Sequence, residues 1–446
     1  MPTLFPYQRT GVAYLMRHPC ALLADEPGVG KTAQAIMSIP YDSPVLVLCP
    51  KIAKGVWRRE FNLWRPGEFD VKLLTGRAQF RWPKPGEVCC TTYDSTPKDL
   101  LTYPAEGTYV ILDELQLAKN PRAQRTKGTR AICKVARFSH GRLIGLTGTP
   151  LLNSGEELWD ILDLLQLAKK AYGSKERFVK VFGGRVVENE YYLTQRKTNP
   201  RTPRFRYEWD GVVTPEARSG FQKVSLRRLQ AEVLKDLPER LYNDIPLELD
   251  APGKAAIKSM MTALKQSGLS VESLVEIIES GKYREGFDIG VLARARMALA
   301  IAKIPAMLNY LGDFEENQKP LVVFSAHRGP IETLTERPGW AVIHGGVSAS
   351  QRTKIEDAFQ AGKLLGVGMT IKAGGVAITL THAAHCLFVD REWVPALNRQ
   401  AEMRLARIGQ KFNVLVSTLI YDHPVELLVY AALFRKTALE KEVVGL

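Results

Sequence analysis

The sequence predicts an α/β protein with two lobes, each a parallel β-sheet covered by helices, and with helical insertions between the lobes. Two observations predict this class. Short apolar runs alternate with helical patterns over residues 1–150, and the same alternation returns from residue 320. Residues 151–310 differ, because they read as mostly helical apart from a polar, basic section at 184–215.

The expected strands are short apolar runs, most of which stop at Pro, Thr or Gly. In the first lobe they cover 21–24, 45–50, 88–92, 109–112 and 143–147. In the second lobe they cover 321–324, 341–343, 365–367 and 386–389. Ligands of such sheets bind at the carboxyl ends of the strands, which is where Gly28, Asp113 and Thr147 fall.

The most informative motif joins the first expected strand to a helical segment and reads Asp25-Glu26-Pro27-Gly28-Val29-Gly30-Lys31-Thr32. The glycines would let backbone N–H groups approach phosphate oxygens, beside the positive end of the following helix. Lys31 would reach the β- and γ-phosphates, and the Thr32 hydroxyl would bind Mg²⁺. The generic pattern has a glycine six residues before the lysine, where this chain has Asp25. The motif predicts a nucleotide site.

A second acidic motif ends the strand expected at 109–112. Asp113 would hold Mg²⁺, usually through water, and Glu114 would polarise the attacking water. An ordinary strand that runs into an acidic turn would look similar. The phosphate loop about eighty residues earlier favours the catalytic interpretation.

Two arginines in the second lobe are candidates for catalysis. Arg404 and Arg407 are three residues apart, so we expect one helical face to present both. Paired guanidinium groups suit the charge that builds on a γ-phosphate during transfer. A solvated basic helix face is the alternative, and the order of the motifs favours the catalytic role.

Composition limits the kinds of binding partner, membrane segment and metal site that we expect. The net charge of +14 over 446 residues favours a polyanionic partner, without distinguishing DNA, RNA or a membrane surface. No signal peptide and no run of 18 apolar residues is present. The six cysteines show no Cys-x-x-Cys spacing and are expected to be reduced, buried thiols. His382 and His385 have helical spacing among apolar residues, so we expect helix packing rather than a metal site.

The order of these motifs resembles superfamily 2 nucleic-acid motors, and within them the SNF2 family of double-stranded DNA translocases. The stretches that carry the resemblance are 4–12, 25–32, 47–64, 91–94, 113–120, 146–150, 153–165, 226–238, 323–327, 344–359, 370–381 and 400–410. Residues 302–327 most resemble the branch of annealing helicases and fork remodellers, in a minimal bacterial or phage-like form.

The resemblance implies two RecA-like lobes and a division of the chain. The expected parts are a first lobe at 1–152, a protrusion with a basic insertion at 153–225, an inter-lobe linker at 226–250, a helical protrusion at 251–314, a second lobe at 315–425 and a helical tail at 426–446. It also implies that Gln8 contacts adenine and that Gln400 lies with the nucleotide-binding residues. Lys51, Thr92 and Lys372 are implied as contacts to the DNA backbone.

One residue departs from the family pattern. Gln116 stands where the family usually has a histidine, so the motif reads Asp-Glu-Leu-Gln. Glutamine can form a hydrogen bond toward the motif at 146–150, but it cannot become charged. The departure puts in doubt how hydrolysis is coupled to DNA, and it leaves hydrolysis itself in place.

Two basic clusters predict contacts with DNA phosphates. The first, at 119–130, includes Lys119, Arg122 and Arg125, and the second, at 196–206, includes Arg201, Arg204 and Arg206. Neither contains an acidic residue, and such clusters give affinity without reading sequence. For the second cluster, a solvated basic face beside a strand that packs its aromatic residues inward is an equal alternative.

The function that follows is an ATP-dependent double-stranded DNA translocase, with ATP and Mg²⁺ as cofactors. The expected partner is double-stranded or branched DNA, with the chain monomeric on DNA, not at a membrane, and in the cytoplasm of a bacterium or a phage-infected cell. Two alternatives remain. One is a strand-separating superfamily 2 DNA or RNA helicase, and the other is a nucleic-acid-binding module with an inactive ATPase.

Overall fold

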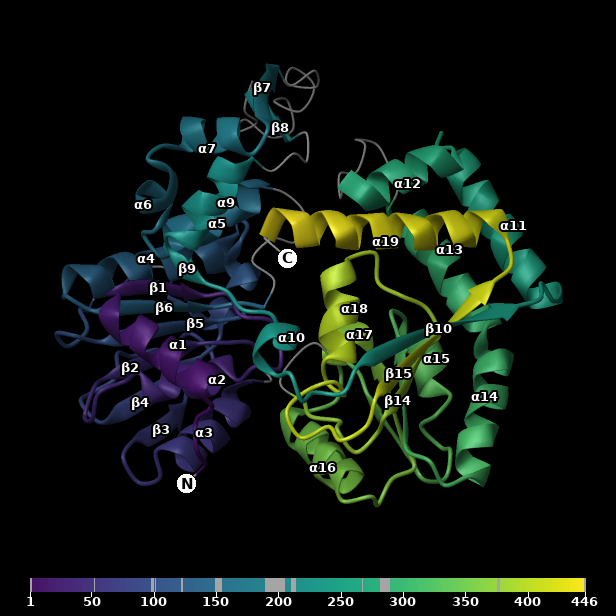
Figure 1. Ribbon diagram of the computed structural model, residues 1–446, viewed down its shortest axis with the longest axis horizontal. Helices are drawn as coiled ribbons and strands as arrows, with labels where there is room; N and C mark the ends of the chain where they lie inside the picture. The colour runs from purple at the N-terminus through teal and green to yellow at the C-terminus, as the bar shows by residue number, and fades with distance from the viewer. Residues whose placement is uncertain are drawn as a thin grey trace. The chain divides into compact units, whose positions relative to one another are not determined.

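The computed structural model of the chain describes residues 2–51, 53–97, 100, 102–121, 123–148, 155–188, 205–209, 214–266, 268–280, 289–374 and 378–444. The chain forms two compact units (Figure 1). One consists mainly of residues up to Leu229, and the other mainly of residues from Gln230 onward. Each unit contains its own parallel sheet.

The first unit is built on a sheet of seven strands in the order β3-β4-β2-β5-β6-β1-β9, and every neighbouring pair is parallel. The strands are β1 (Cys20–Leu23), β2 (Val45–Leu48), β3 (Asp70–Leu73), β4 (Glu87–Thr91), β5 (Tyr109–Asp113), β6 (Arg142–Leu146) and β9 (Ser225–Leu226). The central strands are buried over almost their whole length, which explains their continuous apolar sequences.

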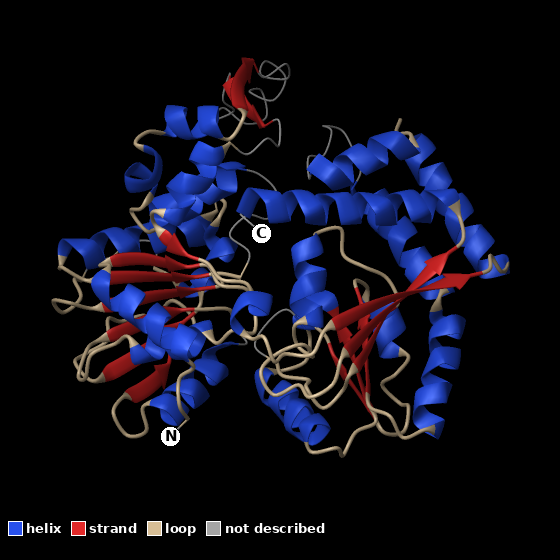
Figure 2. Ribbon diagram, in the orientation of Figure 1, coloured by secondary structure: helices blue, strands red, loops and turns tan. Residues whose placement is uncertain are grey.

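Helices cover this sheet (Figure 2). They are α1 (Pro6–Arg17), α2 (Lys31–Met37), α3 (Ala53–Trp64) and α4 (Gln124–Phe138), with short 3₁₀ turns η1 (Tyr93–Ser95) and η2 (Leu115–Ala118). In α3 the buried residues Ala53, Trp57 and Phe61 recur every four positions, so one stripe of the helix faces the core.

A helical insertion follows β6 in the sequence. Its elements are α5 (Gly155–Leu164), α6 (Ala168–Tyr172), α7 (Lys175–Val181), the antiparallel pair β7 (Gly184–Glu188) and β8 (Phe205–Trp209), and α9 (Pro215–Gln222). The rings of Tyr172, Phe178 and Phe182 pack against one another at centroid distances of 4.4 to 5.7 Å. These aromatic contacts hold the insertion together.

The second unit has a six-stranded parallel sheet in the order β10-β15-β14-β11-β13-β12. Its strands are β10 (Arg240–Leu247), β11 (Leu321–Ser325), β12 (Trp340–Ile343), β13 (Gly366–Thr370), β14 (His385–Phe388) and β15 (Val414–Tyr421). The predicted architecture of two parallel-sheet lobes is therefore confirmed.

The helices of the second unit include the long helical insertion that the sequence predicted. These helices are α10 (Gln230–Val233), α11 (Ala251–Gln266), α12 (Val271–Ser280), α13 (Ile289–Ala302), α14 (Ile304–Glu316), α15 (Arg328–Glu332), α16 (Ala349–Gln360), α17 (Ile371–Gly374), α18 (Pro395–Glu402) and α19 (Pro424–Val444), which belongs to this unit up to Ala438. Lys303, between α13 and α14, is buried and donates hydrogen bonds to the Leu419 carbonyl at 2.8 Å and to the Glu426 carboxylate.

Two local predictions were wrong. Helix α18 ends at Glu402, so Arg404 and Arg407 lie in the turns beyond it rather than on a shared helical face. The carbonyl of Arg404 accepts its hydrogen bond from the Leu380 amide at 2.9 Å instead of from a following helical residue. His385 begins strand β14, because parallel pairing with β15 overrides the local helical spacing.

Two other expectations concern the cysteines and the membrane. All six cysteines are free thiols, and five of them are buried, which agrees with the expectation of reduced thiols. Within the described ranges, no helix combines the length and the apolar character that a membrane span requires.

Candidate nucleotide site and nucleic-acid contacts

The phosphate loop lies between β1 and α2, at the carboxyl edge of the first sheet. Pro27, Gly28 and Val29 form its turn and Gly30 precedes α2; Gly28 and Gly30 have φ values of 84° and 79°, in the left-handed region that glycine favours. A Cβ atom on Gly30 would lie 2.3 Å from Nε2 of Gln8. The structure therefore brings Gln8 of α1 against the loop, and its contact with adenine stays a prediction.

Lys31 and Thr32 begin helix α2. The Lys31 ammonium donates hydrogen bonds to the carbonyl oxygens of Asp25 at 2.7 Å and Glu26 at 2.9 Å. Burial lowers the pKa of Lys31, while the carboxylates of Glu114, Asp25 and Asp113 act in the opposite direction. The loop lysine and the acidic motif are thus electrostatic neighbours, as the nucleotide interpretation requires.

Asp113 ends β5 and is held by two aromatic residues. Its Oδ2 accepts a hydrogen bond from Trp57 Nε1 at 2.8 Å, and its carbonyl accepts one from the Tyr93 hydroxyl at 2.8 Å. Burial, followed by the Glu114 carboxylate, raises the pKa of Asp113 to about 7, and the Trp57 hydrogen bond opposes this rise. A divalent cation at Asp113 would favour the ionised carboxylate.

The oxygen ligands at this edge fit Mg²⁺. The Thr32 hydroxyl and the Asp113 carboxylate are the hard oxygen donors that Mg²⁺ prefers, and Mg²⁺ commonly takes one or two protein ligands beside phosphates and waters. Across the described residues, no three His, Cys, Asp or Glu side chains gather into a protein-only metal site. The two oxygen donors therefore fit a Mg²⁺ ion whose other ligands are phosphates and waters.

Glu114 occupies an unusual backbone position. Its φ and ψ are 51° and 52°, in the left-handed region, which costs a non-glycine residue on the order of 1 kcal/mol. Gln116 Nε2 donates to Glu114 Oε2 at 2.5 Å, and Gln116 Oε1 accepts from the Thr147 hydroxyl at 2.7 Å. The predicted hydrogen bond from Gln116 toward the motif at 146–150 is confirmed, and it connects Glu114 to the end of β6.

In the second unit, Arg404 and Arg407 both hold the segment 378–380. The Arg407 guanidinium donates to Thr379 Oγ1 at 3.0 Å and to the Ile378 carbonyl at 3.3 Å. Arg404 is largely buried, and its carbonyl accepts from the Leu380 amide. Gln400 is buried in α18. The structure therefore brings Arg404 and Arg407 together with residues 378–380.

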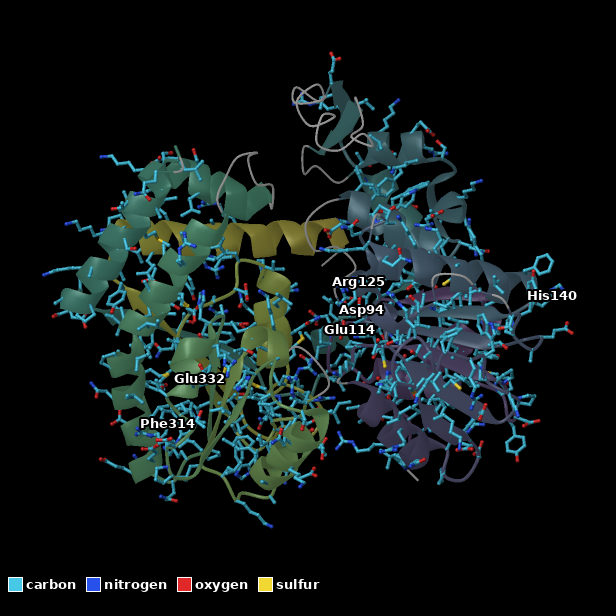
Figure 3. The ribbon with its side chains drawn as sticks, turned by 180° about the vertical axis from the view of Figure 1, so that it is seen from behind. Asp94, Glu114, Arg125, His140, Phe314 and Glu332 are labelled. Atoms are coloured by element: carbon cyan, nitrogen blue, oxygen red, sulfur yellow. The ribbon has the colours of Figure 1, made fainter. Side chains whose placement is uncertain are left out.

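The basic cluster at 119–130 is partly neutralised by acids from other elements. Lys119 pairs with Glu157 at 2.6 Å, Arg125 lies 3.9 Å from Asp94, and Arg130 pairs with Asp163. Figure 3 labels Asp94 and Arg125 on the first unit. Sequence inspection found no acid within the cluster, because these partners come from η1 and α5.

The other predicted DNA contacts belong to other segments of the chain. Lys51 is exposed after β2, and the Thr92 hydroxyl lies 2.8 Å from that of Ser95. Lys372 of α17 is exposed and pairs with Glu392 at 2.9 Å. Arg206 lies on β8, whereas Arg122, Arg201 and Arg204 lie outside the described residues.

Sequence reasoning missed three residues that shape the nucleotide site. Trp57 and Tyr93 hold Asp113, and Arg228 pairs with Asp25. Trp57 gave only an indirect signal, since a tryptophan on an apolar stripe usually finds a partner for its N–H when it is buried. Arg228 was singled out only as part of the stretch 226–238, and its link to the loop was missed because its partner lies 203 residues away in the sequence.

Comparison with known proteins agrees with this architecture. Residues 7–279 match the SNF2-related domain, and residues 302–409 match the helicase conserved C-terminal domain. The chain is 28% identical over 97% of its length to human DNA annealing helicase and endonuclease ZRANB3, and it spans 40% of that protein. It is 29% identical over 94% of its length to the Caenorhabditis elegans homolog of SWI/SNF-related matrix-associated actin-dependent regulator of chromatin subfamily A-like protein 1, and it spans 58% of it.

A solved structure is also similar. The Sulfolobus solfataricus SWI2/SNF2 ATPase core in complex with dsDNA aligns with 100% of this chain and 93% of its own, at 21% identity and a TM-score of 0.43. The SNF2-related match alone spans more than half of the 446 residues. The chain therefore belongs to the SNF2-related family, with a helicase C-terminal domain in its second lobe.

Proposed function

We propose that the chain is an ATPase that double-stranded or branched DNA stimulates, and that it uses ATP to move along or remodel that DNA. The observation that carries the proposal is the position of Lys31, Asp113 and Glu114, which follow or end the parallel strands β1 and β5 and so lie at the same carboxyl edge of one sheet. A nucleic-acid-binding module with an inactive ATPase would have no need to keep this constellation. The net charge of +14 supports a polyanionic partner.

Each residue has a separate proposed role in hydrolysis. Lys31 binds the β- and γ-phosphates, and Thr32 and Asp113 hold Mg²⁺, which supplies charge neutralisation when it is bound. Glu114 orients and polarises the attacking water. Gln8 and Gln400 are proposed to contact the nucleotide. Catalysis then rests mainly on positioning and charge stabilisation.

The remaining assignments are also proposals. Arg404 and Arg407 are proposed to stabilise the charge on the γ-phosphate. Residues 153–225 and 251–314 are proposed as protrusions, with 226–250 as the linker, and the chain is proposed to act as a monomer on DNA. The proposed DNA contacts are Lys51, Thr92, Lys119, Arg122, Arg125, Arg201, Arg204, Arg206 and Lys372. Such contacts to phosphates are blind to sequence, which suits movement along DNA.

The first test is which nucleic acid stimulates ATP hydrolysis. We expect duplex or forked DNA to stimulate the ATPase more than single-stranded DNA or RNA. We also expect ATP-dependent displacement of a third strand from a DNA triplex, with little unwinding of a plain tailed duplex. Efficient unwinding of the tailed duplex without triplex displacement would instead support a strand-separating helicase. The Lys31→Ala variant is the control for dependence on ATP.

The two hydrogen bonds of Gln116, with Glu114 and with Thr147, predict a smaller loss of ATPase activity than the loss expected for Lys31→Ala. Gln116→Ala removes the hydrogen bonds to Glu114 and Thr147, so the Glu114 carboxylate loses a partner that fixes it. A hydrogen bond to a charged group contributes about 1.5 to 3 kcal/mol, so we expect DNA-stimulated kcat to fall roughly tenfold or more. The KM for ATP should change little. Gln116→His can rebuild the bridge, and a histidine variant as slow as the alanine variant would contradict this role.

A further inference from the structure

The segment 225–228 runs beside the start of the phosphate loop. Strand β9 pairs with β1 through Leu22 with Ser225 and Leu23 with Leu226. The pairing continues beyond both strands, because the Ala24 amide donates to the Leu226 carbonyl at 2.8 Å. The Glu26 amide likewise donates to the Arg228 carbonyl at 3.0 Å. Residues 24–26 and 226–228 therefore continue the ladder of β1 and β9, which Figure 1 labels.

The Arg228 side chain forms hydrogen bonds with Asp25, the first residue of the loop, and with Gln34, in the helix that follows the loop. Its Nε donates to Asp25 Oδ1 at 3.0 Å, and one terminal nitrogen donates to Asp25 Oδ2 and to Gln34 Oε1, the latter at 2.7 Å. Gln34 lies in α2 and is buried, and its Nε2 donates to the Gly30 carbonyl at 3.3 Å. One guanidinium thus links the first residue of the loop to the helix that follows it.

Arg228 also contacts the segment that carries Gln8. Its other terminal nitrogen donates to the Tyr7 carbonyl, and its guanidinium lies 5.4 Å from the centre of the Tyr7 ring. Helix α1 packs against this cluster at Gly11, where only a glycine leaves enough room. A Cβ atom on Gly11 would lie 1.8 Å from Gln34 Oε1 and 2.9 Å from the Arg228 guanidinium. The cluster therefore joins α1, the loop, α2 and the segment after β9.

The ion pair between Arg228 and Asp25 is largely buried, so the Asp25 carboxylate depends on Arg228 as its partner. The Asp25 side chain is 0% exposed and that of Arg228 is 12% exposed. A carboxylate at this depth is strongly unfavourable without a partner, and a bidentate guanidinium is its best-matched partner. Asp25 stands where the generic phosphate loop has a glycine. The ion pair with Arg228 explains how a buried, charged residue can occupy that position.

We propose that Arg228 is a positioning residue that couples nucleotide binding to the docking of residues 226–229 on the first lobe. It acts through Asp25, which lies at the start of the loop, and touches no phosphate itself. Coupling of this kind is reciprocal, so nucleotide in the loop stabilises the docked segment, and the docked segment tightens nucleotide binding. The inference rests on the proposed function only in that the loop binds a nucleotide.

The test measures nucleotide affinity in the full chain. Arg228→Gln and Asp25→Asn should each weaken binding of a fluorescent ATP analogue with Mg²⁺ about tenfold and raise the KM for ATP similarly, while kcat at saturating ATP changes less than threefold. Both substitutions break the same ion pair. The double variant, Arg228→Gln with Asp25→Asn, should therefore bind the analogue no more weakly than the single variant that has the lower affinity. Arg228→Lys keeps the charge without the fork and should be intermediate.

The matched control is Arg81→Gln. Arg81 makes a bidentate pair with Glu87, with both N–O distances at 2.6 Å, at the other end of the same sheet. This variant should bind the analogue as the parent does. If Arg228→Gln does not fold, as judged by circular dichroism, the comparison rests on Arg228→Lys and Asp25→Asn. Parent-like affinity in the variants that fold would overturn the proposal.

Hydrogen exchange separates coupling from a merely structural role. In the parent, the ATP analogue should slow exchange of the Ala24 and Glu26 amides, which donate to residues 226 and 228. This nucleotide-dependent protection should be lost in Arg228→Gln and kept in Arg81→Gln. Equal protection in Arg228→Gln and the parent would refute the coupling. A parent that binds the analogue but never hydrolyses ATP would refute the proposed function alone.

Discussion

Replacing Glu114 by glutamine should stop ATP turnover and leave ATP binding in place. The substitution keeps the shape of the side chain and a carbonyl oxygen for the hydrogen bond from Gln116. It removes the negative charge that would polarise the attacking water, and loss of such a group typically slows a reaction by a factor on the order of 10³. We expect a fall of that size in DNA-stimulated kcat, measured by phosphate release at saturating ATP.

Two comparisons make this prediction specific. Lys31→Ala removes the cation for the phosphates, so it should abolish both tight nucleotide binding and hydrolysis. Glu87→Gln is a matched control, because Glu87 begins β4 at the amino edge of the same sheet, away from Asp113. Arg81 holds the pKa of Glu87 at about 2, so this control should lose some stability and keep its turnover. Parent-like hydrolysis by Glu114→Gln would remove Glu114 from the proposed role.

Local sequence was sufficient for the parts of the site that are local in the chain. The phosphate loop and the Asp113–Glu114 pair are short motifs, and buried parallel strands leave continuous apolar runs. Both α/β lobes and the helical insertion between them followed from the same periodicities. These features need no knowledge of which distant residues meet.

The features that sequence could not predict all depend on distant contacts. Trp57 meets Asp113 across 56 residues, and Arg228 meets Asp25 across 203 residues. The acids that pair with Lys119 and Arg130 come from α5, so a cluster that is purely basic in sequence is partly neutralised in space. Helix α18 ends before Arg404 because the backbone there bonds to the segment at 380 instead. At the end of α18, local helix propensity gives way to a tertiary contact.

Arg404→Ala and Arg407→Ala should each cut DNA-stimulated turnover by a factor on the order of 10³, while ATP binding stays largely intact. An arginine that stabilises the charge of phosphoryl transfer acts on the transition state, so its loss lowers kcat much more than affinity. The measurement is steady-state hydrolysis with saturating duplex DNA, together with equilibrium binding of an ATP analogue. Without DNA the same variants should differ less from the parent.

The structure predicts different side effects for the two variants. Arg404 contributes its carbonyl to the hydrogen bond with Leu380, and alanine keeps that bond. Arg407 donates through its side chain to Thr379 and Ile378, so Arg407→Ala should also lower the melting temperature of the chain. A lower melting temperature by itself would not slow turnover at temperatures where the chain stays folded.

A surface arginine in the same unit gives the control for both variants. Arg328 pairs with Glu332 on α15, and both side chains are about half exposed (Figure 3 labels Glu332). Exposed pairs of this kind contribute about 0.3 to 0.5 kcal/mol, so Arg328→Ala should leave turnover and melting temperature nearly unchanged. If Arg404→Ala or Arg407→Ala hydrolyses ATP as fast as Arg328→Ala, that arginine does not contact the γ-phosphate. That arginine would then have a structural role, through contacts such as those with residues 378–380.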